Sequence, residues 1–414
     1  MTRLKTNSPW LLLLVFGDVS GVQITRFVPR PGMPLTSRQR VSRAENVNRV
    51  TQKAHHMAES GVQELPEGPI DVVGDVHGES DALVNLLKKL GYDDLGRHGD
   101  GRRLVFVGDL IDRGPDSPAV LRMVKRLVES GFAQCVAGNH EINAIRNEAE
   151  KDRSGEGWWY GRNEEPYQSV AVDPREKEES FLPFLRELPG ALEREDLRVV
   201  HACWHAPSIE RLRDASNVID AFYREAEANK KNLEDLGRSL RERVGAEKFE
   251  WARIKNEDVK LELIPELAAY DEANQMGNAI KVATSGIERA ARDSYWASGK
   301  WRMVERVPWW EEYAGPPVIV GHYWRRYDPS VSVAQSKRNA DLFGGTAPNE
   351  TLGPAAQVMC IDYSVGMRFL ERGRAAGAEP KAYEACLAAL RLPEWQLVFD
   401  DERPSLDVVR EPAA

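Results

Sequence analysis

The sequence predicts an α/β fold built around a parallel β-sheet. Three stretches, which begin at residues 70, 102 and 133, share one pattern: a short aliphatic run ends in polar residues, and a turn or a helical pattern follows. Such runs are typical of buried strands, and strand–helix units in succession favour parallel strands with right-handed crossovers. The length of 414 residues allows two or three domains, or one domain with large insertions.

Each of the three units ends in a short polar motif. The first strand leads into GDVHG (74–78) and a helix over 79–90, and the second, RRLVFVGD (102–109), leads into a helix over 117–131. The third, AQCVAGNHE (133–141), ends in Gly-Asn-His-Glu. Because ligands of open α/β sheets bind at the carboxyl ends of the strands, we expect these motifs to meet at one edge.

The rest of the chain predicts further strands around a large insertion. Strands are expected within 197–204, 316–322 and 356–364, with a terminal hairpin over 387–400. Residues 207–315 are rich in Glu, Lys, Arg and Ala at helical spacing and predict a helical insertion or cap. We therefore expect a catalytic domain over 67–405, with a loosely ordered extension over 1–66 and a tail over 406–414.

Composition narrows the class of protein and its partners. The net charge of −9 argues against a nucleic-acid-binding surface, although a local pocket for phosphate is compatible with it. The apolar run at 9–16 is too short for a membrane helix and lacks a clear cleavage site, so no membrane partner is expected. The four cysteines form no C-x-x-C pair, which favours a reducing cytoplasm.

Six polar side chains at predicted strand ends form a candidate metal site. They are Asp75, His77, Asp109, Asn139, His201 and His322. Oxygen and imidazole ligands suit divalent ions such as Mn, Fe or Zn. Taken singly, the aspartates and Asn139 could be turn or helix-capping residues, and the last two histidines could be core residues. Three motifs in the same strand-turn context favour the metal site.

The motifs GDVHG (74–78), GDLIDRG (108–114) and GNHE (138–141) together resemble the signature of the phosphoprotein phosphatase group of calcineurin-like metallophosphoesterases, of bacterial type. The resemblance implies a four-layer α/β/β/α sandwich with two divalent metal ions, Mn foremost. It implies that Asp75, His77 and Asp109 hold the first ion. The second would be held by Asp109, Asn139, His201 and His322, so that Asp109 bridges the two.

The remaining motif residues suggest roles in phosphoester hydrolysis. His140 could protonate the leaving group as general acid, with Asp112 to orient it and raise its pKa. Arg113 offers a planar fork for two phosphate oxygens, and Asn139 also lies among the expected substrate contacts. Within FEWARIKNE (249–257), a Trp-x-Arg block similar to one in the family makes Arg253 the candidate for a second phosphate arginine.

These features predict a metal-dependent phosphoester hydrolase that uses a hydroxide activated by two metal ions, with a phosphoprotein or a small phosphoester as substrate. A dinucleoside polyphosphate hydrolase of the diadenosine tetraphosphate type is the alternative within the class. A catalytically silent metal-binding scaffold is the alternative outside it. The chain departs from the family beside the expected metal ligands, with HAC (201–203), GHYW (321–324) and IDYS (361–364), so altered walls are expected for the substrate groove.

Overall fold

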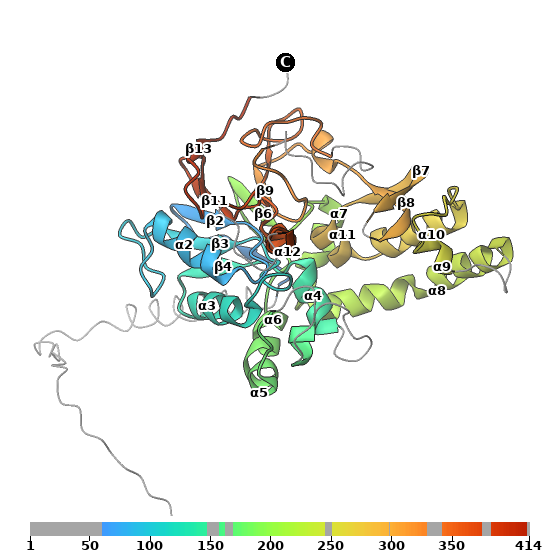
Figure 1. Ribbon diagram of the computed structural model, residues 1–414, viewed down its shortest axis with the longest axis horizontal. Helices are drawn as coiled ribbons and strands as arrows, with labels where there is room; N and C mark the ends of the chain where they lie inside the picture. The colour runs from blue at the N-terminus through green and yellow to red at the C-terminus, as the bar shows by residue number, and fades with distance from the viewer. Residues whose placement is uncertain are drawn as a thin grey trace, which may run out of the picture. The chain divides into compact units, whose positions relative to one another are not determined.

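The structure is a computed structural model that describes residues 60–146, 157–161, 169–244, 251–297, 299–328, 342–374 and 382–411. In these residues the chain forms two mixed β-sheets that pack face to face, with helices on their outer sides (Figure 1). This is the α/β sandwich that the sequence predicts. Most of the expected extension, residues 1–59, lies outside the described residues.

The first sheet carries the three signature motifs. In order across the sheet, its strands are β13 (Leu406–Asp407), β12 (Gln396–Phe399), β11 (Ala388–Leu392), β2 (Ile70–Val73), β3 (Arg103–Phe106) and β4 (Ala133–Cys135). The strands β2, β3 and β4 are parallel, as predicted, and β11 and β12 form the expected terminal hairpin. The helices α2 (Ser80–Leu90) and α3 (Ser117–Glu129) follow β2 and β3 along the chain.

The second sheet carries the two later histidines. Its strands, in order, are β1 (Val62–Glu64), β5 (Ala191–Arg194), β6 (Leu197–Val200), β9 (Val318–Val320) and β10 (Val358–Cys360). All neighbouring pairs are parallel except β5 and β6, which are antiparallel. The parallel pair β6 and β9 therefore delivers both following loops to the same edge of this sheet.

Strand alternation explains how the sheets hold these loops in place. Val72 and Val105 point into the layer between the sheets, where they pack with Val199 and Ile319 of the second sheet. The next residue along, such as Phe106, packs on the opposite face with the apolar side chains of α2 and α3. Burying one such side chain contributes about 1.5–3 kcal/mol, so the two-sided core fixes the strand ends from which the site is built.

Several shorter helices connect the strands. They are α4 (Asn139–Arg146), η1 (Gly157–Tyr160), α5 (Pro174–Glu176), η2 (Lys177–Phe181), α6 (Leu182–Arg186), α7 (Ala206–Arg213), η3 (Trp309–Glu311), η4 (Val365–Met367) and α12 (Arg368–Arg374). The start of α4 coincides with the third motif, because Asn139 is its first residue.

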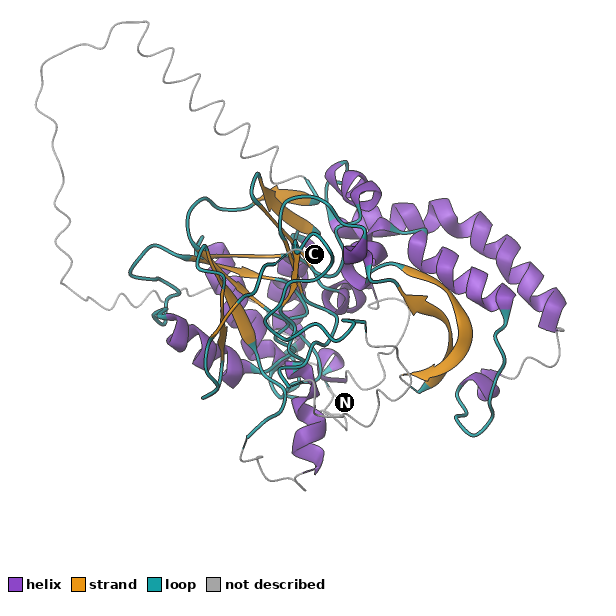
Figure 2. Ribbon diagram, turned by 90° about the horizontal axis from the view of Figure 1, so that it is seen from above, coloured by secondary structure: helices purple, strands orange, loops and turns teal. Residues whose placement is uncertain are grey.

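The segment 207–315 contains the expected helices and also a β-hairpin. Its helices after α7 are α8 (Val218–Val244), α9 (Trp251–Ile254), α10 (Pro265–Met276) and α11 (Ala279–Ser285). An antiparallel hairpin of β7 (Glu288–Ala297) and β8 (Lys300–Arg306) follows, and Figure 2 shows it curving beside the long helices. The sequence pattern predicts helices for this segment and does not predict the hairpin. In β8, Trp301 and Met303 are buried, whereas Arg302 and Arg306 line a cavity.

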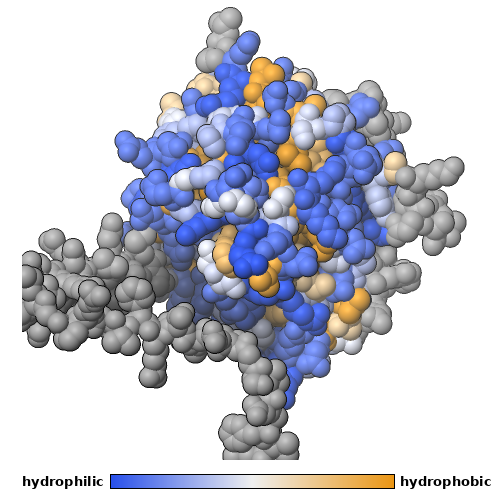
Figure 3. All heavy atoms as spheres, turned by 90° about the vertical axis from the view of Figure 1, so that its left-hand side faces the viewer, coloured by the Kyte–Doolittle hydropathy of each residue, from blue (hydrophilic) through white to orange (hydrophobic). Residues whose placement is uncertain are grey.

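The ordered strands extend beyond the expected domain limits of 67–405. The strand β1 pairs with β5, and β13 pairs with β12, so residues on both sides of those limits belong to the sheets. The face seen in Figure 3 is mainly hydrophilic, with apolar residues exposed in small groups. Among the described residues, no helix combines the length and apolar character needed to cross a membrane.

Candidate metal centre and active site

The six predicted metal ligands all follow strands and lie together at one edge of the two sheets. In the first sheet, Asp75 and His77 follow β2, Asp109 follows β3 and Asn139 follows β4, whereas His201 and His322 follow β6 and β9. Asp109 is central, because it belongs to two groups of possible ligands, one with His77 and His140 and one with His201 and His322. Within each group, the candidate ligand atoms lie within 4.8 Å of one another.

The histidines His77 and His201 are oriented as metal ligands usually are. Nδ1 of His77 lies 3.0 Å from the carbonyl oxygen of Ile111, and Nδ1 of His201 lies 2.8 Å from that of Val107. Because a carbonyl only accepts, each Nδ1 donates its proton there. Both Nε2 atoms then face Asp109 Oδ2, at 3.7 and 3.4 Å. This second hydrogen bond through the other ring nitrogen is typical of a histidine that binds metal.

The electrostatics of the cluster favour a cation. Burial, and then the Asp362 carboxylate, raise the pKa of Asp75 well above its usual range. Burial alone would lower the pKa of His201, but the neighbouring Asp109 carboxylate raises it to about 10. Without a metal ion, His201 therefore carries a proton, for which a divalent ion would compete.

Asn139 and His322 complete the set on the other side of Asp109. Burial, and then Arg306, lower the pKa of His322 well below its usual range, so the ring is neutral and keeps a lone pair. The amide oxygen of Asn139 lies 3.3 Å from His201 Nε2. The reversed amide would instead donate to His322 Nδ1 at 2.8 Å. Asn139 thus lies beside both later histidines, and the carboxylates, imidazoles and amide gathered around Asp109 are a donor set that fits a divalent metal ion.

His140 is held by a buried carboxylate beside the candidate ligands. Its Nδ1 lies 2.5 Å from Asp112 Oδ2, and the indole N–H of Trp158 donates to Asp112 Oδ1 at 2.9 Å. Asp112 is fully buried, whereas His140 is half-buried. Arg113 reaches across the site, with Nη1 3.0 Å from His77 Nε2 and Nη2 3.2 Å from His140 Nε2. The structure thus brings together the predicted acid, its carboxylate and the first arginine.

The site loops adopt a backbone conformation that ordinary residues rarely take. Positive φ angles between 46° and 75° occur at His77, Asp109, Asp112, Arg113 and His322. Each such position costs on the order of 1–3 kcal/mol and persists only where the surroundings impose it. One close approach explains a motif glycine: a Cβ on Gly114 would lie 2.2 Å from the carbonyl oxygen of His77.

Glu141 supports the site but was not singled out in the sequence. Its buried carboxylate accepts the backbone N–H groups of Asp109 and Leu110 at 2.8 Å and that of Gly138 at 2.9 Å. Glu141 therefore ties the loop after β3 to the loop after β4. Its place in the GNHE motif, one residue after His140, is the signal that could have identified it.

The structure does not bring Arg253 to the site. Arg253 is exposed on α9 and does not line the cavity, so the Trp-x-Arg match in the sequence is not supported by position. The second arginine beside the candidate ligands is Arg306 at the end of β8, whose Nη2 lies 3.0 Å from His322 Nε2. Sequence reasoning missed it, because nothing in its local pattern relates the hairpin to the strand ends.

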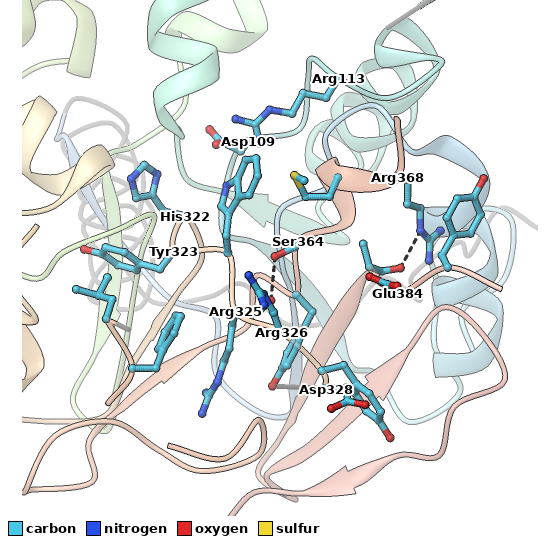
Figure 4. A pocket seen from close by; sticks show the side chains of 18 of the residues that line it. Asp109, Arg113, His322, Tyr323, Arg325, Arg326, Asp328, Ser364, Arg368 and Glu384 are labelled. Atoms are coloured by element: carbon cyan, nitrogen blue, oxygen red, sulfur yellow. Dashed lines mark hydrogen bonds between the residues drawn. The ribbon is translucent and has the colours of Figure 1, made fainter. Parts of the chain in front are cut away.

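A cavity of about 2120 Å³ opens over the candidate ligands. Figure 4 shows Asp109, Arg113 and His322 along one side of it, with Tyr323, Arg325 and other residues lining the rest. The hairpin of β7 and β8 contributes another wall. This volume exceeds the roughly 300–1,000 Å³ of a pocket for a drug-sized ligand.

Comparison with known proteins agrees with this geometry. Residues 68–233 match the model of the calcineurin-like phosphoesterase family. The matched segment contains all three of the motifs that carry the predicted resemblance. It contains the first four of the six candidate ligands and also His201.

Individual relatives match a shorter part of the chain. Over 73 residues it is 51% identical to the asymmetrical bis(5'-nucleosyl)-tetraphosphatase PrpE of Halalkalibacterium halodurans, which is 17% of this chain and 30% of the relative. Over 74 residues it is 53% identical to the PrpE protein of a Geobacillus species, again 17% of this chain and 30% of the relative. The matches thus span less than a third of these relatives.

Among solved structures, a putative diadenosine tetraphosphatase is similar with a TM-score of 0.38 and 17% identity, over 85% of this chain and 100% of that chain. A cold-active protein-tyrosine phosphatase from a psychrophilic Shewanella species has a TM-score of 0.41 and 15% identity, over 84% of each chain.

Proposed function

We propose that the chain is a metal-dependent phosphoester hydrolase. The observation that carries this proposal is the meeting of five strand ends from two sheets around Asp109, beside a histidine that a buried carboxylate orients. Asp75, His77 and Asp109 would hold one ion. Asp109, Asn139, His201 and His322 would hold the other. Oxygen and imidazole ligands without thiolate are compatible with Mn, and with Fe or Zn as alternatives.

The residues around this centre have distinct tasks in the proposed reaction. Two bound divalent ions would supply a hydroxide nucleophile at neutral pH and neutralise charge on the phosphate. Arg113 would bind two phosphate oxygens through its planar guanidinium. His140 would give its Nε2 proton to the departing oxygen, while Asp112 holds the opposite ring nitrogen and stabilises the charged ring. Arg306 would bring a second guanidinium to the substrate, in place of Arg253.

For the substrate, we propose a dinucleoside polyphosphate. The names of the PrpE relatives support this class, although the matches cover only a part of each protein. The cavity of about 2120 Å³ also suits a substrate with two nucleosides and several phosphates. The sequence placed a phosphoprotein first and this class second. The names of the relatives favour the second of these classes.

A substrate panel tests this proposal. The full chain would be assayed with Mn on diadenosine tetraphosphate, phosphopeptides and p-nitrophenyl phosphate. We expect the highest kcat/KM for diadenosine tetraphosphate and loss of turnover with a chelator or with Asp109→Asn, because an amide cannot bridge two cations as a carboxylate does. Full activity without metal would refute the mechanism, and a preference for phosphopeptides would refute the substrate class.

A matched pair of arginine variants tests the second phosphate contact. Arg306→Ala is expected to raise KM for each substrate in the panel, since it removes a guanidinium 3.0 Å from His322. Arg253→Ala should leave KM unchanged, because that side chain does not line the cavity. The opposite result would restore the assignment made from the sequence.

A further inference from the structure

Trp324 is a large aromatic residue left exposed beside the candidate metal centre. It is 36% exposed, whereas its neighbours Tyr323 and Arg325 are 4% and 2% exposed. Its side chain lines the cavity that opens over the ligands. It also lies two residues after His322 in the same loop. A tryptophan exposed in this way does not gain the free energy of burying its ring unless a ligand covers it.

The loop holds Trp324 in a fixed and unusual backbone conformation. Its φ is 55°, in the left-handed region that residues other than glycine seldom occupy. The backbone N–H of Trp324 donates to Asp362 Oδ2 at 2.9 Å, and the N–H of Arg325 donates to the Asp362 carbonyl oxygen at 2.8 Å. The Arg325 carbonyl accepts the hydroxyl of Ser364 at 2.9 Å. The indole is thus presented to the cavity by a backbone that the surrounding structure constrains.

The indole also contacts the proposed phosphate arginine. The Arg113 guanidinium carbon lies 4.4 Å from the centre of the indole ring, in a cation–π contact. The same guanidinium lies 3.0 Å from His77 and 3.2 Å from His140. A phosphate bound by Arg113 would therefore be next to an exposed aromatic surface. In a nucleotide, a single ribose separates the phosphate from a flat aromatic base.

We propose that Trp324 is the surface on which a nucleobase stacks when the adjoining phosphate is bound at Arg113. This inference rests on the proposed function, since it assumes a nucleotide substrate, and it adds the residue that would recognise the base. Stacking on an aromatic side chain accepts every base, because each base has a π-face. The subsite would therefore select nucleotides over ring-free phosphoesters without selecting a particular base.

Two ligands that differ only by the base provide the test. Adenosine 5′-monophosphate and ribose 5-phosphate would each be titrated by calorimetry into the Mn-loaded full chain. We expect the base to improve affinity by roughly 5- to 150-fold, the range that one stacked base provides. The ratio of the two affinities cancels any effect on Arg113, which both phosphates contact.

Variants of Trp324 then test whether its indole causes the difference in affinity between the two ligands. Trp324→Leu should bring it close to one, whereas Trp324→Phe should keep most of it because a ring remains. Tyr223→Leu is the matched control, since Tyr223 is a 44% exposed aromatic that does not line the cavity, and it should leave the ratio unchanged. An unchanged ratio in Trp324→Leu, or no preference for the base in the unaltered protein, would overturn the proposal.

A second pair of ligands separates a nucleobase from a phenyl ring. Phosphotyrosine and phosphoserine would be titrated in the same way. If Trp324→Leu removes the advantage of phosphotyrosine but not that of the nucleotide, the nucleobase assignment fails. Free phosphate would be measured after each titration, so that binding and hydrolysis are read separately. A protein that prefers the nucleotide through Trp324 but hydrolyses no ester would refute the proposed function and leave the subsite standing.

Discussion

Glu141 is the residue through which the two central loops of the site depend on each other. Its Oε2 accepts the N–H groups of Asp109 and Gly138, and its Oε1 accepts that of Leu110. The side chain is fully buried, so water cannot replace these bonds. Asp109 lies on the first of these loops, and Asn139 directly follows the second as the first residue of α4. A change at Glu141 should therefore alter metal binding although the residue is not itself a proposed ligand.

Glu141→Gln keeps the shape of the side chain and removes one acceptor. The remaining oxygen can satisfy the N–H groups of Asp109 and Gly138, but the amide NH2 then faces the N–H of Leu110. One buried donor is left unsatisfied, which costs about 1–3 kcal/mol of unfolding free energy. Misplacing the loops should also weaken Mn binding by roughly 10- to 100-fold, as is typical for residues that orient metal ligands.

The assay combines urea unfolding with Mn titration of the same protein samples. Glu225→Gln is the control, because Glu225 is also buried, accepts the N–H of Ala279 and does not line the cavity. The control should lose stability but keep the Mn affinity of the unaltered protein. Normal Mn affinity in Glu141→Gln would refute the view that this carboxylate positions the ligands.

Further predictions concern proton transfer, proton release and the N-terminal extension. His140→Asn should keep metal content but slow alkyl phosphate hydrolysis by roughly 10²–10⁴-fold, and esters with acidic leaving groups less; equal slowing across a leaving-group series would contradict the acid role. Because the pKa of His201 is raised to about 10, Mn binding at pH 7 should release a proton from it and tighten as pH rises. Calorimetry in two buffers of different ionisation enthalpy measures this release, and identical heats would argue against it. A chain that starts at Met57 keeps β1 and should retain its melting temperature and turnover; loss of either would place the extension in the fold.

The strand ends and their motifs could be predicted because their signals are local. An aliphatic run followed by Gly-Asp is visible within a few residues, and the pairing of β2, β3 and β4 follows from repeated units of this kind. The same reasoning identified His201 and His322, which the structure brings to Asp109. Here the local pattern and the tertiary contact coincide.

Features that depend on distant contacts could not be predicted in this way. The hairpin of β7 and β8 lies in a segment rich in charged residues, where its alternation is hidden and its role depends on where it packs. Arg253 and Arg306 are both arginines of this segment, and only their positions in space distinguish them. The sequence around Trp324 did not indicate an exposed side chain either. The indole is exposed because of a backbone conformation that Asp362 maintains.

The arrangement of His140 bears on the choice between a hydrolase and a silent metal-binding scaffold. A scaffold needs ligands for its ions, and the six predicted ligands would supply them without His140, which also lies within reach of His77 and Asp109. Yet Asp112 is fully buried at a positive φ, and it is held by the indole N–H of Trp158 so that its other oxygen meets His140 Nδ1 at 2.5 Å. Burying a carboxylate and straining its backbone both cost free energy, and metal binding by the six predicted ligands does not require them. They are useful if His140 must carry a proton toward a leaving group, which favours the hydrolase.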